Sequence, residues 1–216
     1  MVPEDYQALF FDFDGVLVDS VEVKTTAFAR MFEPYGADIV AQVVDYHRRH
    51  GGMTRVDKFR YYYAELLKQP LSEARLAQLC DDFAKLVVDE VVAAPEITGA
   101  EEFLQVCLGR VSCLVISAAP AGELDEIINR RGLAGFFHEV HGAPGKKAEH
   151  LASILHRTGW APSKCLFFGD AASDYNAARA CDVPFLGVVP GEDAPLLEAA
   201  NGICWVRDFS QLQVRS

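Results

Sequence analysis

The sequence predicts an α/β protein with a parallel sheet covered by helices on both faces and with an inserted all-helical domain. Short apolar runs alternate with amphipathic helical patterns over residues 100–207, which is typical of successive strand–helix–strand units. One further apolar run, residues 8–11, stands near the start of the chain. A long stretch without a convincing strand separates it from the others, and this gap predicts the insert.

The apolar runs and the helical patterns give the expected elements of the core. The expected strands cover residues 8–11, 113–117, 139–141, 165–169, 185–189 and 203–206. The expected helices cover residues 121–131, 147–158 and 171–181. In an open parallel sheet the ligand crevice lies outside the carboxyl ends of the strands, so the residues directly after these runs are candidates for a site.

The stretch between the first two strands predicts a second domain. It contains four amphipathic patterns punctuated by glycine and proline, over residues 21–35, 39–50, 54–68 and 72–93. We therefore predict a core of residues 1–19 and 96–216 and a helical cap of residues 20–95. Because the cap begins just after the first strand, we expect it above the crevice, where it can exclude water and select a ligand.

Composition restricts the partners of the protein. The chain has 216 residues and a formal net charge of −11, which argues against nucleic acid because a phosphate backbone needs a basic surface. The six cysteines show no metal-type spacing and suit a reducing compartment. No signal peptide is apparent, and no apolar stretch approaches the roughly 20 residues of a membrane span. We expect a cytoplasmic protein that binds neither nucleic acid nor membrane.

Two carboxylates stand directly after the first expected strand. Asp12 and Asp14 follow residues 8–11, and Gly15 lets the backbone turn out of the strand. Buried acids are costly to desolvate unless a cation pairs with them. Metal binding and phosphoryl chemistry both supply a cation, although a carboxylate pair by itself is more often just a strand end and its turn.

Two later segments carry groups suited to an anion. Ser117 ends an expected strand and the small Ala118 follows, so that a hydroxyl and backbone N–H groups can approach an anion; the alternative for Ser117 is a helix cap. Lys146 and Lys147 begin an expected helix, where a lysine opposes the helix dipole. One of the two is expected to reach a bound anion and the other to be solvated. Register with the buried face of the helix favours Lys147.

A fourth segment repeats the acidic pattern of the first. Asp170 follows Gly169 at the end of an expected strand, and Asp174 lies four residues later, one turn into a helix. Asp170 is placed to share a hard cation with Asp12, and such oxygen ligands suit Mg²⁺. The alternative for Asp174 is an acid that stabilises the first helical turn, and it can serve both purposes.

These segments resemble, in order, the four motifs of the haloacid dehalogenase superfamily of hydrolases. The resemblance is to members with a small helical cap, in the branch of phosphoglycolate phosphatase and β-phosphoglucomutase. It covers essentially the whole chain and implies a Rossmann-like core with residues 20–95 as the cap. The motifs are Asp12-Phe13-Asp14-Gly15, Ser117, Lys147, and Gly169-Asp170 with Asp174.

The resemblance implies a role for each motif residue. Asp12 would be the nucleophile that forms an aspartyl-phosphate, and Asp14 would be the general acid and then the general base. Mg²⁺ would be held by the carboxylates of Asp12 and Asp170, the backbone carbonyl of Asp14 and, directly or through water, Asp174. The phosphoryl group would be bound by Gly15, Ser117, the N–H of Ala118, and Lys147.

The expected function is a Mg²⁺-dependent phosphatase for a small phosphorylated metabolite, such as a sugar phosphate or a phosphoglycolate-like ester. Asp14 favours ester chemistry, because relatives that dehalogenate or cleave carbon–phosphorus bonds lack an acid there. The alternatives are a phosphomutase of the β-phosphoglucomutase type and a catalytically silent binding module. The mutase histidine after the first motif is absent, and Lys24 stands near its place. The complete carboxylate set argues against a silent module.

One segment of the expected cap bears on the substrate. Thr54-Arg55 resembles the cap segment of the β-phosphoglucomutase branch whose arginine faces a distal substrate phosphate, so Arg55 is a candidate for substrate binding; the alternative is a surface arginine. Other basic cap residues can also line the site, among them Lys24, His47 and Lys58. The sequence leaves open the alcohol half of the substrate and the oligomeric state.

Overall fold

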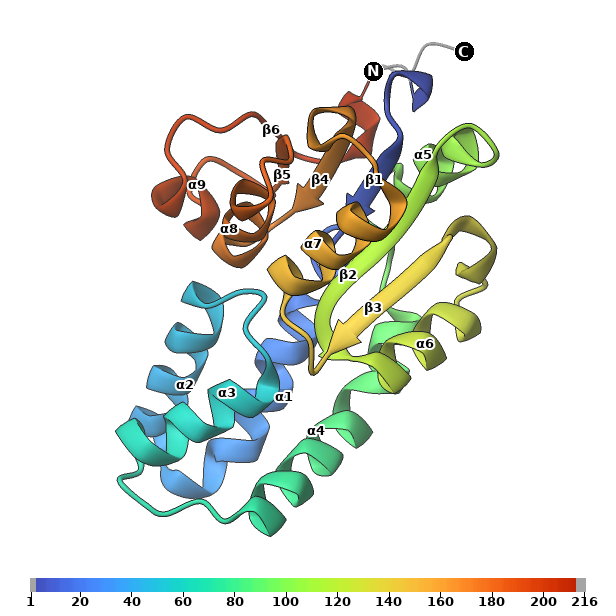
Figure 1. The fold of residues 1–216 in the computed structure, drawn as a ribbon. Helices are drawn as coiled ribbons and strands as arrows, with labels where there is room; N and C mark the ends of the chain where they lie inside the picture. Colours follow the sequence, from blue (N-terminus) through green and yellow to red (C-terminus); the bar gives the residue numbers. More distant parts are fainter. Residues whose placement is uncertain (1–2, 213–216) are drawn as a thin grey trace.

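The computed structural model describes residues 3–212 and contains a six-stranded parallel sheet (Figure 1). The strand order is β3-β2-β1-β4-β5-β6. The strands are β1 (Ala8–Phe11), β2 (Ser112–Pro120), β3 (Glu139–Ala143), β4 (Cys165–Gly169), β5 (Phe185–Val188) and β6 (Trp205–Val206). The predicted α/β fold with a parallel sheet is confirmed.

The register of the central strands positions the site. β1 lies between β2 and β4, and Phe11 at its carboxyl end is opposite Val115 on one side and Phe168 on the other. All four residues of β1 are buried, as expected for a strand covered on both faces. The segments that follow β1, β2 and β4 therefore emerge at the same edge of the sheet.

Alternate residues of β1 pack against different helices. Phe10 belongs to an apolar cluster with Leu151 and Ile154 of α7 (Lys147–Thr158), and α8 (Ala172–Ala180) lies on the same face. Phe11 belongs to a second cluster with Phe103 of α5 (Ala100–Cys107), and α6 (Ala121–Arg130) contributes to that cluster. The short α9 (Pro195–Ala199) packs near α8 at the far edge. The period-2 alternation of the strand thus builds both layers.

Four of the five α-helices between β1 and β2 form the helical insert, which lies beyond the carboxyl edge of the sheet in Figure 1. They are α1 (Val21–Phe32), α2 (Ala37–Arg49), α3 (Arg55–Tyr61) and α4 (Glu73–Ala93). Buried aromatic side chains from three of these helices pack together, including Phe28, Phe59 and Phe83. At the end of α4, the carbonyls of Val91, Val92 and Ala94 accept hydrogen bonds from Arg131, the residue just after α6.

Several predicted boundaries need correction. The helix predicted over 21–35 ends at Phe32, and a 3₁₀ turn that contains Pro34 follows, because proline cannot donate the next helical hydrogen bond. The helix predicted over 54–68 changes at Tyr62 into a π-helical turn. β2 continues three residues beyond Ser117. Helix α5 was not predicted, because eight residues are too few to show a clear helical repeat of apolar positions.

Candidate active site

Three neighbouring strands bring Asp12, Ser117 and Asp170 to one edge of the sheet. Asp12 follows β1 directly, and its backbone N–H donates to the carbonyl oxygen of Phe168 in β4 over 2.9 Å. Asp170 is the first residue after β4, and Ser117 lies in the second half of β2. Asp12 and Ser117 are buried. Residues more than 150 positions apart, Asp12 and Asp170, therefore meet because their strands are hydrogen-bonded neighbours.

The carboxylates of Asp12, Asp170 and Asp174 form a cluster in which one oxygen from each lies within 4.8 Å of the others. One ammonium enters this cluster. Lys147 Nζ lies 2.6 Å from Asp12 Oδ2 and 2.5 Å from Asp174 Oδ1. The buried Oδ1 of Asp170 has no hydrogen-bond partner in the structure of residues 3–212. A buried oxygen of this kind is rare in folded proteins and is explained where a cation binds it.

The electrostatics of the cluster show the same deficit of positive charge. Burial raises the pKa of Asp170 well above its ordinary value, and the neighbouring Asp12 and Asp174 raise it further. Burial also raises the pKa of Asp12 to about 7, although Lys147 opposes the shift. Burial acts to lower the pKa of Lys147, but its two carboxylate partners outweigh burial and raise it. A divalent cation held by oxygen ligands fits this donor set.

Two glycines allow the carboxylates to approach one another. Gly15 has φ +78°, and a Cβ atom there would overlap the carboxylate of Asp170. A Cβ atom on Gly169 would overlap the side chain of Asp174. Asp174 is fully buried at the start of α8, and its Oδ2 accepts the backbone N–H of Ala171 over 3.1 Å. Asp174 thus caps the first helical turn and contacts the cluster, and its part in holding a metal stays a prediction.

Asp14 faces a different set of partners. Its carboxylate forms an ion pair with Lys24 of α1 and accepts a hydrogen bond from Ser20 Oγ over 2.6 Å. Burial opposes ionisation, but Lys24 and Ser20 together hold the pKa of Asp14 below its ordinary value. The sequence placed Lys24 near the site but did not predict this ion pair, which depends on how α1 leaves the strand–turn segment.

Ser117 and the two lysines of the third segment are placed unambiguously. Ser117 lies within β2, and its Oγ accepts the backbone N–H of Ala119 over 3.2 Å, so the helix-cap alternative is wrong. Lys146 is exposed at the start of α7, whereas Lys147 is buried in the acidic cluster. Of the two neighbouring lysines, Lys147 is therefore the one that reaches the site.

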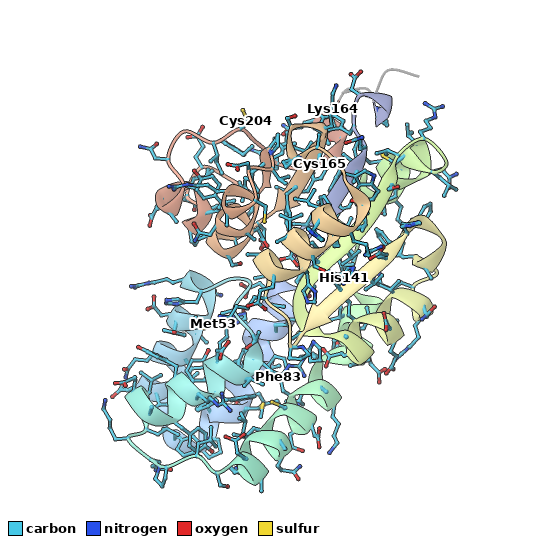
Figure 2. All side chains as sticks on the ribbon, in the orientation of Figure 1. Met53, Phe83, His141, Lys164, Cys165 and Cys204 are labelled. Atoms are coloured by element: carbon cyan, nitrogen blue, oxygen red, sulfur yellow. The ribbon has the colours of Figure 1, made fainter. Side chains whose placement is uncertain are left out.

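A cavity of about 610 Å³ opens above this edge of the sheet. The core contributes Asp12, Asp14, Gly15, Ser117, Ala118 and Asp170 to its walls. The helical insert contributes Phe28, His47, Met53, Arg55, Lys58 and Phe83. Met53, in the loop between α2 and α3, and Phe83 of α4 can be located in Figure 2. The cavity thus lies between the sheet edge and the insert, where the sequence predicted a ligand crevice.

Comparison with known proteins identifies the family. The family model described as haloacid dehalogenase-like hydrolase matches residues 9–188, a span that contains all four motifs. The chain belongs to this family. The sequence-based prediction of a hydrolytic enzyme from this superfamily is therefore confirmed. Within residues 3–212, no helix is both long and apolar enough to cross a membrane.

Individual relatives of this haloacid dehalogenase-like hydrolase are moderately similar. A phosphoglycolate phosphatase of Synechococcus elongatus is 29% identical over 177 residues, which cover 80% of this chain and 79% of the relative. A phosphorylated carbohydrates phosphatase of Thermotoga maritima is 24% identical and covers 96% of this chain and 97% of its own. The crystal structure of a predicted phosphatase from Clostridium acetobutylicum matches with a TM-score of 0.75 at 19% identity and covers 95% of both chains.

In this hydrolase Arg55 is buried, so the alternative of a surface arginine is wrong. One guanidinium nitrogen lies 2.5 Å from Glu123 Oε1 of α6, and the other donates to the carbonyl oxygen of Cys80 over 3.3 Å. The guanidinium also lies 4.6 Å from the ring centroid of Phe83. Arg55 lines the cavity as predicted, but its charge is neutralised by an ion pair that joins the insert to the core. No sequence pattern singled out Glu123, which resembles any acid in a first helical turn.

The loop between α2 and α3 makes a second contact between the insert and the core. Ser173 Oγ of α8 donates to the carbonyl oxygen of Gly51 over 3.3 Å. A Cβ atom on Gly52, whose φ is +69°, would overlap Ser173. The insert therefore touches the start of α8, next to the acidic cluster.

Proposed function

We propose that this hydrolase is a phosphatase that removes the phosphoryl group from a small phosphorylated metabolite through an aspartyl-phosphate on Asp12. The observation that carries the proposal is the buried cluster of Asp12, Asp170, Asp174 and Lys147 at the floor of the cavity. The names of the curated relatives, phosphoglycolate phosphatase and phosphorylated carbohydrates phosphatase, support the same class of reaction.

In the first step an oxygen of Asp12 attacks phosphorus, and the bond from phosphorus to the alcohol oxygen breaks. Asp12 Oδ1 accepts the N–H of Phe13 over 2.7 Å and Oδ2 is held by Lys147, so the carboxylate has a fixed orientation. The departing alcohol takes a proton from Asp14. This step needs the protonated carboxyl of Asp14, so its contact with Lys24 has to be released first.

In the second step water attacks the phosphorus of the aspartyl-phosphate. Asp14 accepts a proton from this water, the bond between phosphorus and Asp12 breaks, and inorganic phosphate leaves. The low pKa of Asp14 in the observed contact suits this step, because the carboxylate is already ionised. Ser117, the Ala118 N–H and Lys147 bind the phosphoryl oxygens, where negative charge gathers in both transition states.

Mg²⁺ fits the acidic cluster, and we propose it as the cofactor. Asp12 and Asp170 would hold it through their carboxylates, with Asp14 through its backbone carbonyl and Asp174 directly or through water. The unpartnered Oδ1 of Asp170 is the atom that a cation would satisfy. When bound, the ion would offset negative charge on the phosphoryl group as it is transferred.

The helical insert is proposed to act as a cap that excludes water during the reaction. It reaches the core through Arg55 with Glu123 and through Gly51 with Ser173, and Arg55 and Gly51 both line the cavity. The mutase alternative rested on Arg55 facing a second phosphate. The ion pair with Glu123 occupies that guanidinium, so no observation now favours a mutase.

The test is phosphate release from a panel of phosphorylated metabolites, with and without Mg²⁺. We expect release that requires the metal and that falls by about 10⁴-fold or more in Asp12→Asn, because that variant lacks the attacking oxygen anion. Rapid acid quenching of the wild type should trap a chain whose mass has increased by one phosphoryl group.

Asp125→Asn is the matched control, because Asp125 is an exposed acid on α6. It should behave as the wild type in every assay. An Asp12→Asn enzyme within tenfold of wild-type activity would contradict the nucleophile assignment, and release from no ester would contradict the phosphatase itself.

A further inference from the structure

The wall of the cavity formed by the helical insert contains a buried lysine without an acidic partner. Lys58 of α3 is only 3% exposed and lines the cavity. Within residues 3–212 it forms no ion pair, and its ammonium nitrogen hydrogen-bonds to His47 Nδ1 over 2.8 Å. The same nitrogen lies 5.8 Å from the ring centroid of Phe28. Buried lysines are almost always paired, so this one requires an explanation.

The other buried or half-buried cations around the cavity are paired. Lys24 pairs with Asp14, Lys147 with Asp12 and Asp174, and Arg55 with Glu123. Arg48 and Arg49 are exposed and pair with Glu22 and Asp45. Lys58 is thus the buried cation of this wall that forms no ion pair among the described residues.

His47 fixes the position of Lys58. The imidazole is 7% exposed and packs against Phe28 with ring centroids 5.0 Å apart. Burial, together with the nearby Lys58 and Lys24, lowers the pKa of His47 to about 3. The ring is therefore neutral, and its Nδ1 accepts a hydrogen bond from Lys58. A neutral acceptor orients the ammonium without cancelling its charge.

We propose that Lys58, oriented by His47, binds a carboxylate on the alcohol half of the substrate. This inference rests on the proposed phosphatase function and deepens it. One unpaired ammonium matches the single negative charge of a carboxylate, whereas a second phosphate group would bring up to two charges to the same point. Lys58 lines the insert side of the cavity, and Asp12 and Asp170 of the acidic cluster line its core side, so both border the same space. Lys58 is then a binding residue and His47 a positioning residue.

The experiment compares two esters of nearly equal size in buffer that contains Mg²⁺. 2-Phosphoglycolate carries the carboxylate, and 2-hydroxyethyl phosphate has a neutral hydroxymethyl group in its place. We expect the wild type to prefer 2-phosphoglycolate in kcat/KM by about tenfold or more, because a charge-assisted hydrogen bond in a buried wall is worth at least that ratio. The preference should lie mainly in KM.

Lys58→Met keeps the length of the side chain but removes the charge. We expect this variant to lose at least tenfold more kcat/KM on 2-phosphoglycolate than on 2-hydroxyethyl phosphate, so that the preference collapses. His47→Asn should reduce the preference by a smaller factor, because the ammonium remains but is no longer oriented. Lys85→Met, at an exposed lysine of α4, is the control and should retain the wild-type preference.

The outcomes separate this inference from the function on which it rests. A wild type that releases phosphate but shows no preference for 2-phosphoglycolate overturns the inference and leaves the phosphatase standing, whether or not Lys58→Met folds. A Lys58→Met variant that keeps the preference also overturns it. Faster turnover of ethylene glycol bisphosphate than of 2-phosphoglycolate overturns the assignment to a carboxylate. No release from any ester overturns the phosphatase, and the inference fails with it.

Discussion

The cavity has two buried, charged walls, which we call its floor and its roof. Negative charge is in excess in the floor and positive charge in the roof. The floor, at the sheet edge, has three clustered carboxylates and one ammonium. The roof, in the helical insert, has Lys58 and His47 with no carboxylate paired to either among residues 3–212. Because buried charge is costly unless it is paired, each region indicates the charge of what it binds. We therefore propose that the floor binds a cation and that the roof binds an anion.

The strongest test of the floor is Asp170→Asn, which removes the carboxylate with the unpartnered oxygen. We expect Mg²⁺-dependent turnover to fall by about 10³-fold, since metal stabilisation of transition-state charge is worth several kcal/mol. Mg²⁺ should raise the thermal unfolding midpoint of the wild type but not of the variant. Without metal the variant should be the more stable protein, because one of three mutually repelling acids is gone.

Asp125→Asn again serves as the control for this comparison, since it removes an equal charge from the surface. An Asp170→Asn protein that is still stabilised by Mg²⁺ as strongly as the wild type would show that the floor is not the metal site.

The difference between the two regions also explains what the sequence could predict. The floor residues follow buried strands, and parallel strands end at one edge, so Asp12, Ser117 and Asp170 could be brought together from the pattern alone. Lys147 could be preferred over Lys146 because helical register decides which one faces inward. These arguments need only local periodicity and the topology of the sheet.

The roof could not be predicted in the same way. Lys58 and His47 lie on two different helices of the insert, and their contact depends on how α2 and α3 cross. The partner of Arg55, Glu123, lies on a core helix 68 residues later in the chain. Amphipathic patterns say which face of a helix is buried but not which neighbour covers it. The segment with Arg55 was therefore found, and its ion pair was not.

Arg55 differs from Lys58 because its buried charge is paired. It forms an ion pair with Glu123, and the two side chains are each 7% exposed. Arg55→Met should lower the free energy of unfolding by about 3–5 kcal/mol, because it leaves a buried carboxylate without its partner. Chemical denaturation measures this loss. Adding Glu123→Gln should recover part of it, since the unpaired charge is then removed.

The control for this ion pair is Arg60→Met, which breaks an exposed pair with Glu73 and should cost no more than about 1 kcal/mol. If Arg55→Met were as mild as Arg60→Met, the guanidinium would not depend on Glu123. Its earlier assignment to the substrate would then regain support.

The buried charge of Lys58 should change how the free energy of unfolding depends on pH. Burial and the nearby Lys24 lower the pKa of Lys58 to about 7, although Asp14 and Asp170 oppose the shift. Between pH 7 and about 10.5 the unfolded chain therefore holds more protons at this position than the folded chain. The free energy of unfolding of the wild type should rise with pH across this window relative to Lys58→Met, on the order of 5 kcal/mol in total.

Urea denaturation at several pH values between 7 and 10.5 measures this difference, and Lys85→Met should follow the wild type. Parallel curves for the wild type and Lys58→Met would mean that the charge of Lys58 is already compensated in the folded protein. The contrast between floor and roof would then disappear.

The smallest expected effect concerns the loop that brings floor and roof together. Gly52 and Gly36 both have positive φ, +69° and +93°, so an alanine at either position costs about 1 kcal/mol in backbone strain. A Cβ atom at Gly52 would also overlap Ser173, whereas at Gly36 it meets no atom within 4 Å. Gly52→Ala should therefore match Gly36→Ala in stability to within about 1 kcal/mol but lower kcat/KM several-fold more, because only Gly52→Ala pushes the insert away from the core. Equal kinetics in the two variants would show that the reaction does not need the insert to sit this close to the acidic cluster.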